Sequence, residues 1–155
     1  MKLDKTDRAL LRLLQVDAAM SLEALAAAVH LTPTPAWRRI QKLEAAGVIR
    51  RRVVLCDASR LGVGVTVFVA IKTAQHNAAW LEKFALSVRD IEEVVELYRM
   101  SGDVDYLMRI VVPDIAGYDA VYKRLIGLVE LSDVSSSFAM ERIKYTTALP
   151  VDYAA

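Results

Sequence analysis

Three segments near the start of the chain carry apolar residues at the spacing of short amphipathic helices. Residues 4–15 place three leucines on one face, and Asp4 precedes them as a candidate N-cap. A second segment follows Ser21, which can cap a short helix that ends near His30. Its apolar stripe consists of Leu22, Leu25, Ala26 and Val29. The third segment, LTPTPAWRRIQKLEAAG over residues 31–47, holds two Thr-Pro pairs and three basic residues.

The third segment predicts a helix that begins at one of its two Thr-Pro pairs. Proline is tolerated in the first turn of a helix, because the N–H that it lacks has no intrahelical partner there. We expect the helix to begin at Pro33, with Pro35 as the alternative, since a residue before proline resists the helical conformation. The buried stripe would then contain Ala36, Ile40, Leu43 and Gly47. The opposite face would contain Thr34, Arg38, Gln41, Lys42 and Ala45.

These three helices, with a tight turn over residues 29–31, predict a helix-turn-helix arrangement. The stretch GVIRRRVVLCD that follows has a different pattern. Gly47 suits the end of a helix, and the β-branched run predicts a strand that serves as wing and linker. We therefore expect a winged helix-turn-helix domain over residues 1–52 and a linker strand over residues 53–62.

The apolar pattern over residues 63–155 predicts four strands and two helices in the order β-α-β-β-α-β. Val65 to Ile71 alternate at a period of two, VVELYRM and YLMRIVV surround the turn SGD, and VSSSFAMERIKYT supplies the last strand. Asn77 can cap a helix with Trp80, Leu81, Phe84 and Val88 on one face. Asp114 can cap another with Ile115, Tyr118, Tyr122, Leu125, Ile126 and Val129 on one face. The expected fold is α+β, with a ferredoxin-like sheet covered on one side by two helices.

The second face of that sheet would stay uncovered in a monomer. This face is apolar in the first strand, so burial against a second subunit is expected, and with it a symmetric homodimer.

Composition limits the class of protein. The chain of 155 residues is 55% hydrophobic, enough for a packed core in one domain or two small ones. No window has the apolar length of a membrane helix, and the first residues lack a signal-peptide pattern, so the cytoplasm is expected. The single cysteine, Cys56, excludes an internal disulfide and has no zinc-site spacing around it, so we interpret it as a half-buried strand residue.

The net charge of +1 hides an uneven distribution. Residues 1–52 hold ten Lys or Arg against five Asp or Glu, whereas residues 53–155 hold ten against fourteen. The basic cluster consists of Arg38, Arg39, Lys42, Arg50, Arg51 and Arg52, opposed only by Glu44. Phosphate binding depends on local rather than total charge, so this cluster favours nucleic acid, although a solvated basic face is the alternative.

Three stretches resemble the Lrp/AsnC (feast/famine) family of bacterial and archaeal transcriptional regulators. They are LTPTPAWRRIQKLEAAGVI, SGDVDYLMRIVVPD and VSSSFAMERIKYTTALP, in the family's order, and the C-terminal half looks closest to members tied to sulfur and branched-chain amino acids. The resemblance implies dimers that assemble into tetramers or octamers and an amino acid bound between dimers. One departure is His30, in a turn where related sequences often have glycine; histidine tolerates the left-handed conformation better than branched residues do.

The resemblance also implies an effector site near the Gly-Asp turn and the last strand. The corresponding positions are Met100, Ser101, Gly102, Asp103, Asp105, Tyr106, Ser135, Ser136 and Ser137. Backbone N–H groups around Gly102 suit a carboxylate, and Asp103 or Asp105 suits an ammonium group. Leucine, methionine or cysteine would fit, but the sequence does not rank them. Without the resemblance, SGDVDY would be interpreted as a hairpin turn.

The candidate DNA contacts follow from the third helix entering the major groove. Arg38 and Gln41 are expected at bases, and Thr32 and Thr34 at a phosphate near the helix N-terminus. Non-specific attraction is expected from Arg39, Lys42, Arg50, Arg51 and Arg52. Trp37 flanks the apolar stripe, so packing at the core edge is favoured over a base contact.

Enzyme motifs are missing from the sequence. The two histidines, His30 and His76, lie in predicted turns, and there is no GxSxG, Walker A, GxGxxG or metal-spaced set. We expect no cofactor or metal. Two other functions stay open: an amino-acid sensor that regulates a protein partner, and a nucleoid-organising protein that needs no effector. The basic third helix favours DNA over a protein partner, because a helix that contacts a protein would rather expose an aliphatic or aromatic stripe. Together with the resemblance, this predicts a DNA-binding transcriptional regulator of amino-acid metabolism or transport.

Overall fold

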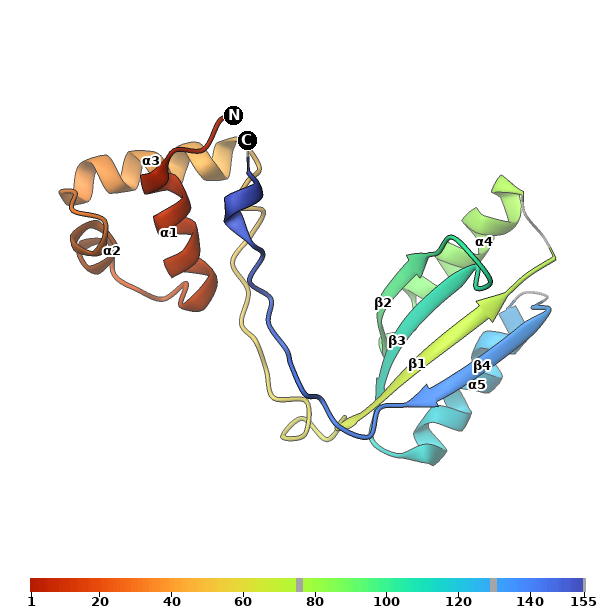
Figure 1. Ribbon diagram of the computed structural model, residues 1–155. Helices are drawn as coiled ribbons and strands as arrows, with labels where there is room; N and C mark the ends of the chain where they lie inside the picture. The colour runs from red at the N-terminus through yellow and green to blue at the C-terminus, as the bar shows by residue number, and fades with distance from the viewer. Residues whose placement is uncertain (75–76, 129–130, 155) are drawn as a thin grey trace. The chain divides into compact units, whose positions relative to one another are not determined.

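The computed structural model describes residues 1–74, 77–128 and 131–154, which form two compact units (Figure 1). One unit contains Met1–Val54 with Lys144–Ala155, and the other contains Leu55–Ile143. The predictions for His76 and Val129 lie outside the described residues. None of the helices in the described ranges is long and apolar enough to cross a membrane.

Three helices form most of the first unit: α1 (Lys5–Val16), α2 (Leu22–Ala28) and α3 (Pro33–Ala45). Asp4 caps α1 in a reciprocal capping box with Asp7, and the Ser21 side chain caps α2. The predicted start at Pro33 is confirmed, with Thr32 in extended conformation at the N-cap. Leu10, Leu25 and Ile40 pack together in the core between the helices.

The predicted turn and helix end are also confirmed. His30 takes a φ of 55°, in the left-handed region, and Gly47 takes a φ of 71° directly after α3. The N–H of Gly47 donates to the Glu44 carbonyl at 2.9 Å and that of Val48 to the Leu43 carbonyl at 2.9 Å. This pair of bonds is a Schellman motif, which stops α3.

The linker differs from the prediction. Residues 50–57, all within the described part of the chain, form no strand. Val53, Val54 and Leu55 are 58%, 87% and 60% exposed, and Cys56 is exposed rather than half-buried. A β-branched run forms a ladder only when another strand pairs with it.

The C-terminal boundary also differs. Residues 144–155, expected in the second domain, belong to the first unit, where Val151 and Ala154 pack against a cluster of Leu3, Leu11 and Leu43.

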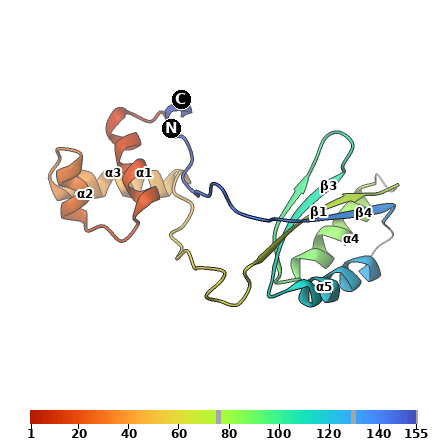
Figure 2. The ribbon, with the colours of Figure 1, turned by 60° about the horizontal axis from the view of Figure 1, so that its bottom comes forward.

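The second unit confirms the predicted order. It contains β1 (Val65–Lys72), α4 (Ala78–Arg89), β2 (Val94–Arg99), β3 (Tyr106–Val112), α5 (Ile115–Leu128) and β4 (Asp133–Phe138), and a 3-10 turn, η1 (Val151–Tyr153), follows in the tail of the first unit. The antiparallel sheet has the order β2-β3-β1-β4. Both helices lie on the same side of it (Figure 2), so the ferredoxin-like α+β fold is confirmed.

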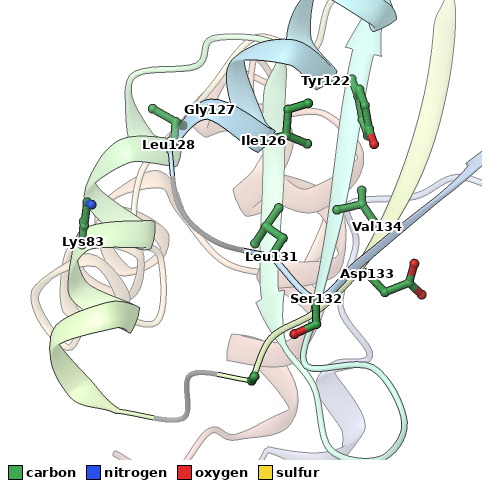
Figure 3. A pocket seen from close by; sticks show the side chains of 10 residues that line it. Lys83, Tyr122, Ile126, Gly127, Leu128, Leu131, Ser132, Asp133 and Val134 are labelled. Atoms are coloured by element: carbon green, nitrogen blue, oxygen red, sulfur yellow. The ribbon is translucent and has the colours of Figure 1, made fainter.

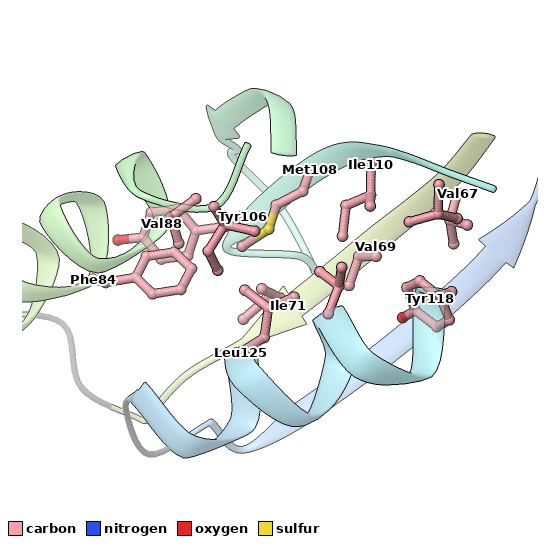
Figure 4. Close-up of a cluster of buried hydrophobic side chains, with 13 residues drawn as sticks. Val67, Val69, Ile71, Phe84, Val88, Tyr106, Met108, Ile110, Tyr118 and Leu125 are labelled. Carbon is pink, nitrogen blue, oxygen red and sulfur yellow. The ribbon is translucent and has the colours of Figure 1, made fainter. Parts of the chain in front are cut away.

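The core of this unit lies between the sheet and the two helices (Figure 4). The sheet contributes residues such as Val69, Ile71 and Met108, all fully buried. The helices contribute Phe84, Val88, Tyr118, Val121 and Leu125. The predicted stripe of α5 is partly wrong, since Ile115 and Ile126 are 72% and 47% exposed whereas Val121 is buried. Within the described ranges, no helix covers the opposite face of the sheet.

Candidate functional site

The outward face of α3 carries polar and basic side chains at its centre. Thr34, Arg38, Gln41 and Lys42 are all exposed, whereas Ala36, Ile40 and Leu43 are buried against the other helices. The Gln41 amide donates to the Glu44 carboxylate at 2.9 Å, a contact along the helix surface that a base edge could replace. This face therefore presents donors and acceptors to the solvent, and their contact with a DNA groove stays a prediction.

Arg39 has a different environment from the other basic residues of α3. Its guanidinium donates to Asp4 at 2.6 Å and to Asp7 at 2.7 Å. The pKa of Asp4 is lowered by the Asp7 backbone N–H and by Arg39, and the pKa of Arg39 is raised by the two carboxylates. Arg39 thus holds α3 to α1, which reduces its capacity to attract phosphate.

The N-terminus of α3 offers fewer donors to an anion than most helix ends. Pro33 and Pro35 have no N–H, so Thr34 supplies the one backbone donor among the first three helical positions. The Thr32 side chain makes no capping bond, and the residue is exposed. A phosphate here would therefore be bound by the Thr34 N–H and the two threonine hydroxyls.

Arg50 and Arg51 follow α3 and are exposed, whereas Arg52 donates to Glu44 at 3.2 Å. Trp37, which was expected to pack at the core edge, is 51% exposed.

The expected effector residues of the β2–β3 connection fall into an exposed group and a structural group. Met100, Ser101, Gly102 and Asp103 are exposed, and Gly102 takes a φ of 113° that favours glycine. The Asp105 carboxylate instead accepts from the Thr73 N–H at 2.9 Å, and its own N–H donates to the Ile71 carbonyl at 3.0 Å. Asp105 thus fixes the turn to the end of β1.

Tyr106 lies in the core rather than at the surface of the turn. It is 6% exposed and packs against Trp80 and Phe84, with ring centroids 5.6 and 5.2 Å away. The alternation of β3 could have predicted this, because Tyr106, Met108 and Ile110 share one face.

The three serines of β4 lie on two faces of the sheet. Ser136 pairs with the buried Val69 in the ladder, and its hydroxyl shares a hydrogen bond with the Tyr118 hydroxyl of α5. Burial raises the pKa of Tyr118, and this hydrogen bond opposes the shift. Ser135 and Ser137 point to the uncovered face, so two of the serines remain available there.

A surface hollow of about 870 Å³ lies between α4, the end of α5 and the start of β4 (Figure 3). Its walls include Lys83, Tyr122 and Leu128 from the helices and Ser132 to Val134 before and within β4. None of the expected effector residues lines it. Among the described residues, no group of three or more His, Cys, Asp or Glu could hold a metal ion.

Two family models match the chain. The AsnC-type helix-turn-helix domain matches residues 3–44, and the Lrp/AsnC ligand binding domain matches residues 66–149. The first match includes the outward face of α3, and the second includes the β2–β3 turn and β4.

Characterised relatives and solved structures agree with these matches. The DNA-binding transcriptional activator DecR of Escherichia coli (strain K12) is 52% identical over 151 residues, which cover 97% of this chain and 99% of DecR. An AsnC family transcriptional regulator from Agrobacterium tumefaciens is 58% identical, with a TM-score of 0.96 over 99% of this chain and 100% of that chain. A transcriptional regulator from Neisseria meningitidis, solved as a complex with L-Met, is 32% identical, with a TM-score of 0.92 over 97% of each chain.

Proposed function

The chain belongs to the Lrp/AsnC family of DNA-binding transcriptional regulators, and we propose that it controls genes of amino-acid metabolism or transport in response to a small amino acid bound between its dimers. The observation that carries the DNA-binding part is the outward face of α3, where Arg38, Gln41 and Lys42 are exposed. Its proposed partners are double-stranded DNA, a free amino acid and further copies of itself, and its proposed location is the cytoplasm.

On DNA, we assign base contacts to Arg38 and Gln41 and phosphate contacts to Thr32 and Thr34. Lys42, Arg50 and Arg51 add attraction that does not depend on sequence. A symmetric homodimer would place two copies of α3 about 34 Å apart, on successive major grooves, so its preferred duplex would be pseudo-palindromic.

For the effector, we place the ligand at the exposed Met100–Asp103 turn and the outward serines of β4, with a second dimer completing the site. Backbone N–H groups near Gly102 would bind its carboxylate, and Asp103 its ammonium group. This surface would be held in place from the core side by Asp105, Tyr106 and Ser136. The relative solved with L-Met supports an amino acid as the chemical class; leucine, methionine and cysteine are the candidates.

Regulation would follow from linkage between ligand and assembly. A ligand that binds between dimers acts only as far as it favours one assembly, tetramer or octamer, over another. The assembly in turn sets how many α3 pairs bind one DNA molecule at once.

The DNA-binding part is tested by a double variant, Arg38→Ala with Gln41→Ala, in a titration with duplex DNA from upstream of the protein's own gene. A bidentate contact to a base contributes about 1–3 kcal/mol, so we expect affinity for this duplex to fall at least tenfold. Arg89→Ala, which removes an exposed arginine of the second unit, is the matched control and should bind as the wild type does. Unchanged affinity of the double variant would refute the base contacts.

The effector part is tested by thermal unfolding with each of the twenty amino acids at millimolar concentration. A ligand at 100 times its dissociation constant adds about 2.7 kcal/mol, so at least one should raise the unfolding temperature. Asp103→Ala should abolish that shift, and Asp90→Ala, at the end of α4, should keep it. No shift in the wild type, with DNA binding intact, would favour the effector-independent nucleoid-organising protein. Loss of DNA binding altogether would favour a sensor that acts on a protein partner.

A further inference from the structure

Trp37 is a large aromatic side chain that the first unit leaves open. Its side chain is 51% exposed, although α3 belongs to a well-packed helical unit. The buried face of α3 consists of Ala36, Ile40 and Leu43 alone. Among the described residues, the aromatic contacts connect rings of the second unit, and Trp37 takes part in none of them. About half of Trp37 therefore faces solvent rather than the core.

Helix geometry places Trp37 beside the proposed base contacts. At 100° per residue, Trp37 lies ~40° around α3 from Gln41 and ~60° from Thr34. On the other side of this face, Arg39 is paired with two carboxylates of the α1 N-terminus, so that side of α3 is covered by α1. The exposed surface of α3 thus extends from Lys42 across Arg38 to Trp37, and the indole forms its apolar edge.

We propose that Trp37 contributes to sequence specificity by packing against the methyl group of a thymine in the major groove; this inference rests on the proposed DNA-binding function. The occupant is chosen by charge, because the exposed Arg38 and Lys42 lie on the same surface of α3 as Trp37 and favour a polyanion. Within the major groove, the 5-methyl group of thymine is the apolar feature that distinguishes one base pair from another. The exposed indole next to Arg38 and Gln41 could therefore contact a thymine methyl group while those two side chains bond to neighbouring base edges.

The first test uses the two tryptophans as spectroscopic probes. A duplex is selected from a random pool by the full-length wild type and then titrated into the protein while the intrinsic fluorescence is recorded. We expect a change in emission on binding, because the duplex would cover the exposed Trp37 whereas Trp80 lies in the second unit. Trp37→Phe should bind the same duplex and lose this change. A change of equal size in Trp37→Phe would overturn the proposal.

The second test asks whether the thymine methyl group and Trp37 are coupled. Each thymine of the selected duplex is replaced in turn by deoxyuridine, which lacks only the methyl group. At one position the wild type should bind about fourfold more weakly, the effect of leaving one methyl group unburied. Trp37→Ala should bind the thymine duplex roughly tenfold more weakly and respond to no replacement at that position. Val16→Ala, which shortens another exposed apolar side chain of the first unit, is the control and should match the wild type.

The outcomes separate this inference from the function on which it rests. If the selection enriches no sequence, sequence-specific DNA binding fails. If the wild type selects a duplex but Trp37→Ala binds it as tightly, the surface at Trp37 serves a protein partner or a second copy. If Trp37→Ala weakens binding but keeps the full response to deoxyuridine, Trp37 contacts DNA elsewhere and the methyl contact is wrong.

Discussion

At the scale of single residues, the position of the recognition helix depends on one arginine and two carboxylates. Arg39 of α3 binds Asp4 at 2.6 Å and Asp7 at 2.7 Å. Asp4 and Asp7 also bond to each other's backbone in the capping box, so one cluster both starts α1 and fixes α3. A residue expected to contact DNA thus instead holds the helix that carries the proposed base contacts.

This cluster should make the first unit less stable in acid. The pKa of Asp4 is lowered by folding, so its contribution is complete above its ordinary value of 3.8 and is lost as the pH falls through the lower folded value. Asp4→Asn keeps a good N-cap but removes the charge. We expect it to lose about 0.2–1 kcal/mol at pH 7, as exposed ion pairs do, and to show a weaker dependence of unfolding temperature on pH between 2 and 5.

The control is Asp90→Asn at the end of α4, which should unfold with the pH dependence of the wild type. If the unfolding temperature of Asp4→Asn depended on pH as that of the wild type does, the ion pair between Arg39 and Asp4 would not stabilise the first unit.

The sequence predicted local chemistry well and tertiary pairing poorly. The caps at Asp4, Ser21 and Asn77 were predicted because a capping side chain bonds to backbone only three residues away. The pairing of Arg39 with Asp4 spans 35 residues, and no local pattern encodes it. The three serines of β4 were expected to act together, but alternation places Ser136 under α5 and its neighbours on the other face.

At the scale of elements, the C-terminal segment is part of the DNA-binding unit. The Gln15 amide donates to the Leu149 carbonyl at 3.1 Å and accepts from the Leu149 N–H at 2.7 Å. Arg8 donates to the Ala154 carbonyl at 2.6 Å, and Arg12 pairs with Asp152. All these bonds join the C-terminal segment to α1. The segment after β4 therefore supports α1, the helix whose N-terminal carboxylates pair with Arg39 of α3.

Disrupting this contact should destabilise the first unit. Val151 packs against Leu3, Leu11 and Leu43, so Val151→Asp would place a charge against apolar side chains. We expect a loss of about 1–3 kcal/mol in the free energy of unfolding of this unit, measured by hydrogen exchange of the α1 amides. Tyr153→Asp introduces the same charge at a side chain that is 89% exposed and should leave exchange unchanged. Equal protection of α1 in both variants would show that the segment gives no support.

Strand lengths were the least predictable part of the elements. VSSSFAMERIKYT was expected to continue as a strand, yet β4 ends at Phe138, opposite Val67 of β1. Its last bond joins the Ala139 N–H to the Thr66 carbonyl, near the first residue of β1. A strand ends where the strand that pairs with it ends, so its length cannot be predicted from its own residue propensities. The linker run near Val53 formed no strand for the same reason.

At the scale of the whole molecule, the uncovered face of the sheet is the proposed surface through which two copies of the chain associate. Phe68 of the central strand β1 is 40% exposed on this face, whereas its neighbours in the strand, Val67 and Val69, are buried on the helix-covered face. Arg109 and Glu96 form an ion pair there at 2.6 Å, and Arg109 lowers the pKa of Glu96. The face therefore carries an exposed aromatic side chain on its central strand beside a charge pair that is already satisfied, which suits burial in a dimer.

Phe68→Asp should separate the proposed dimer into monomers. A carboxylate buried at a symmetric interface meets its own copy and loses hydration without gaining a partner, so association should weaken by several kcal/mol. Light scattering during size-exclusion chromatography should then give the mass of one chain, 17.2 kDa. Leu86→Asp, on an exposed position of α4, is the control and should keep the mass of the wild type. A Phe68→Asp variant with the mass of the wild type would place the interface elsewhere.

The monomer should also lose sequence-specific affinity, because one copy of α3 reads only half of a pseudo-palindromic duplex.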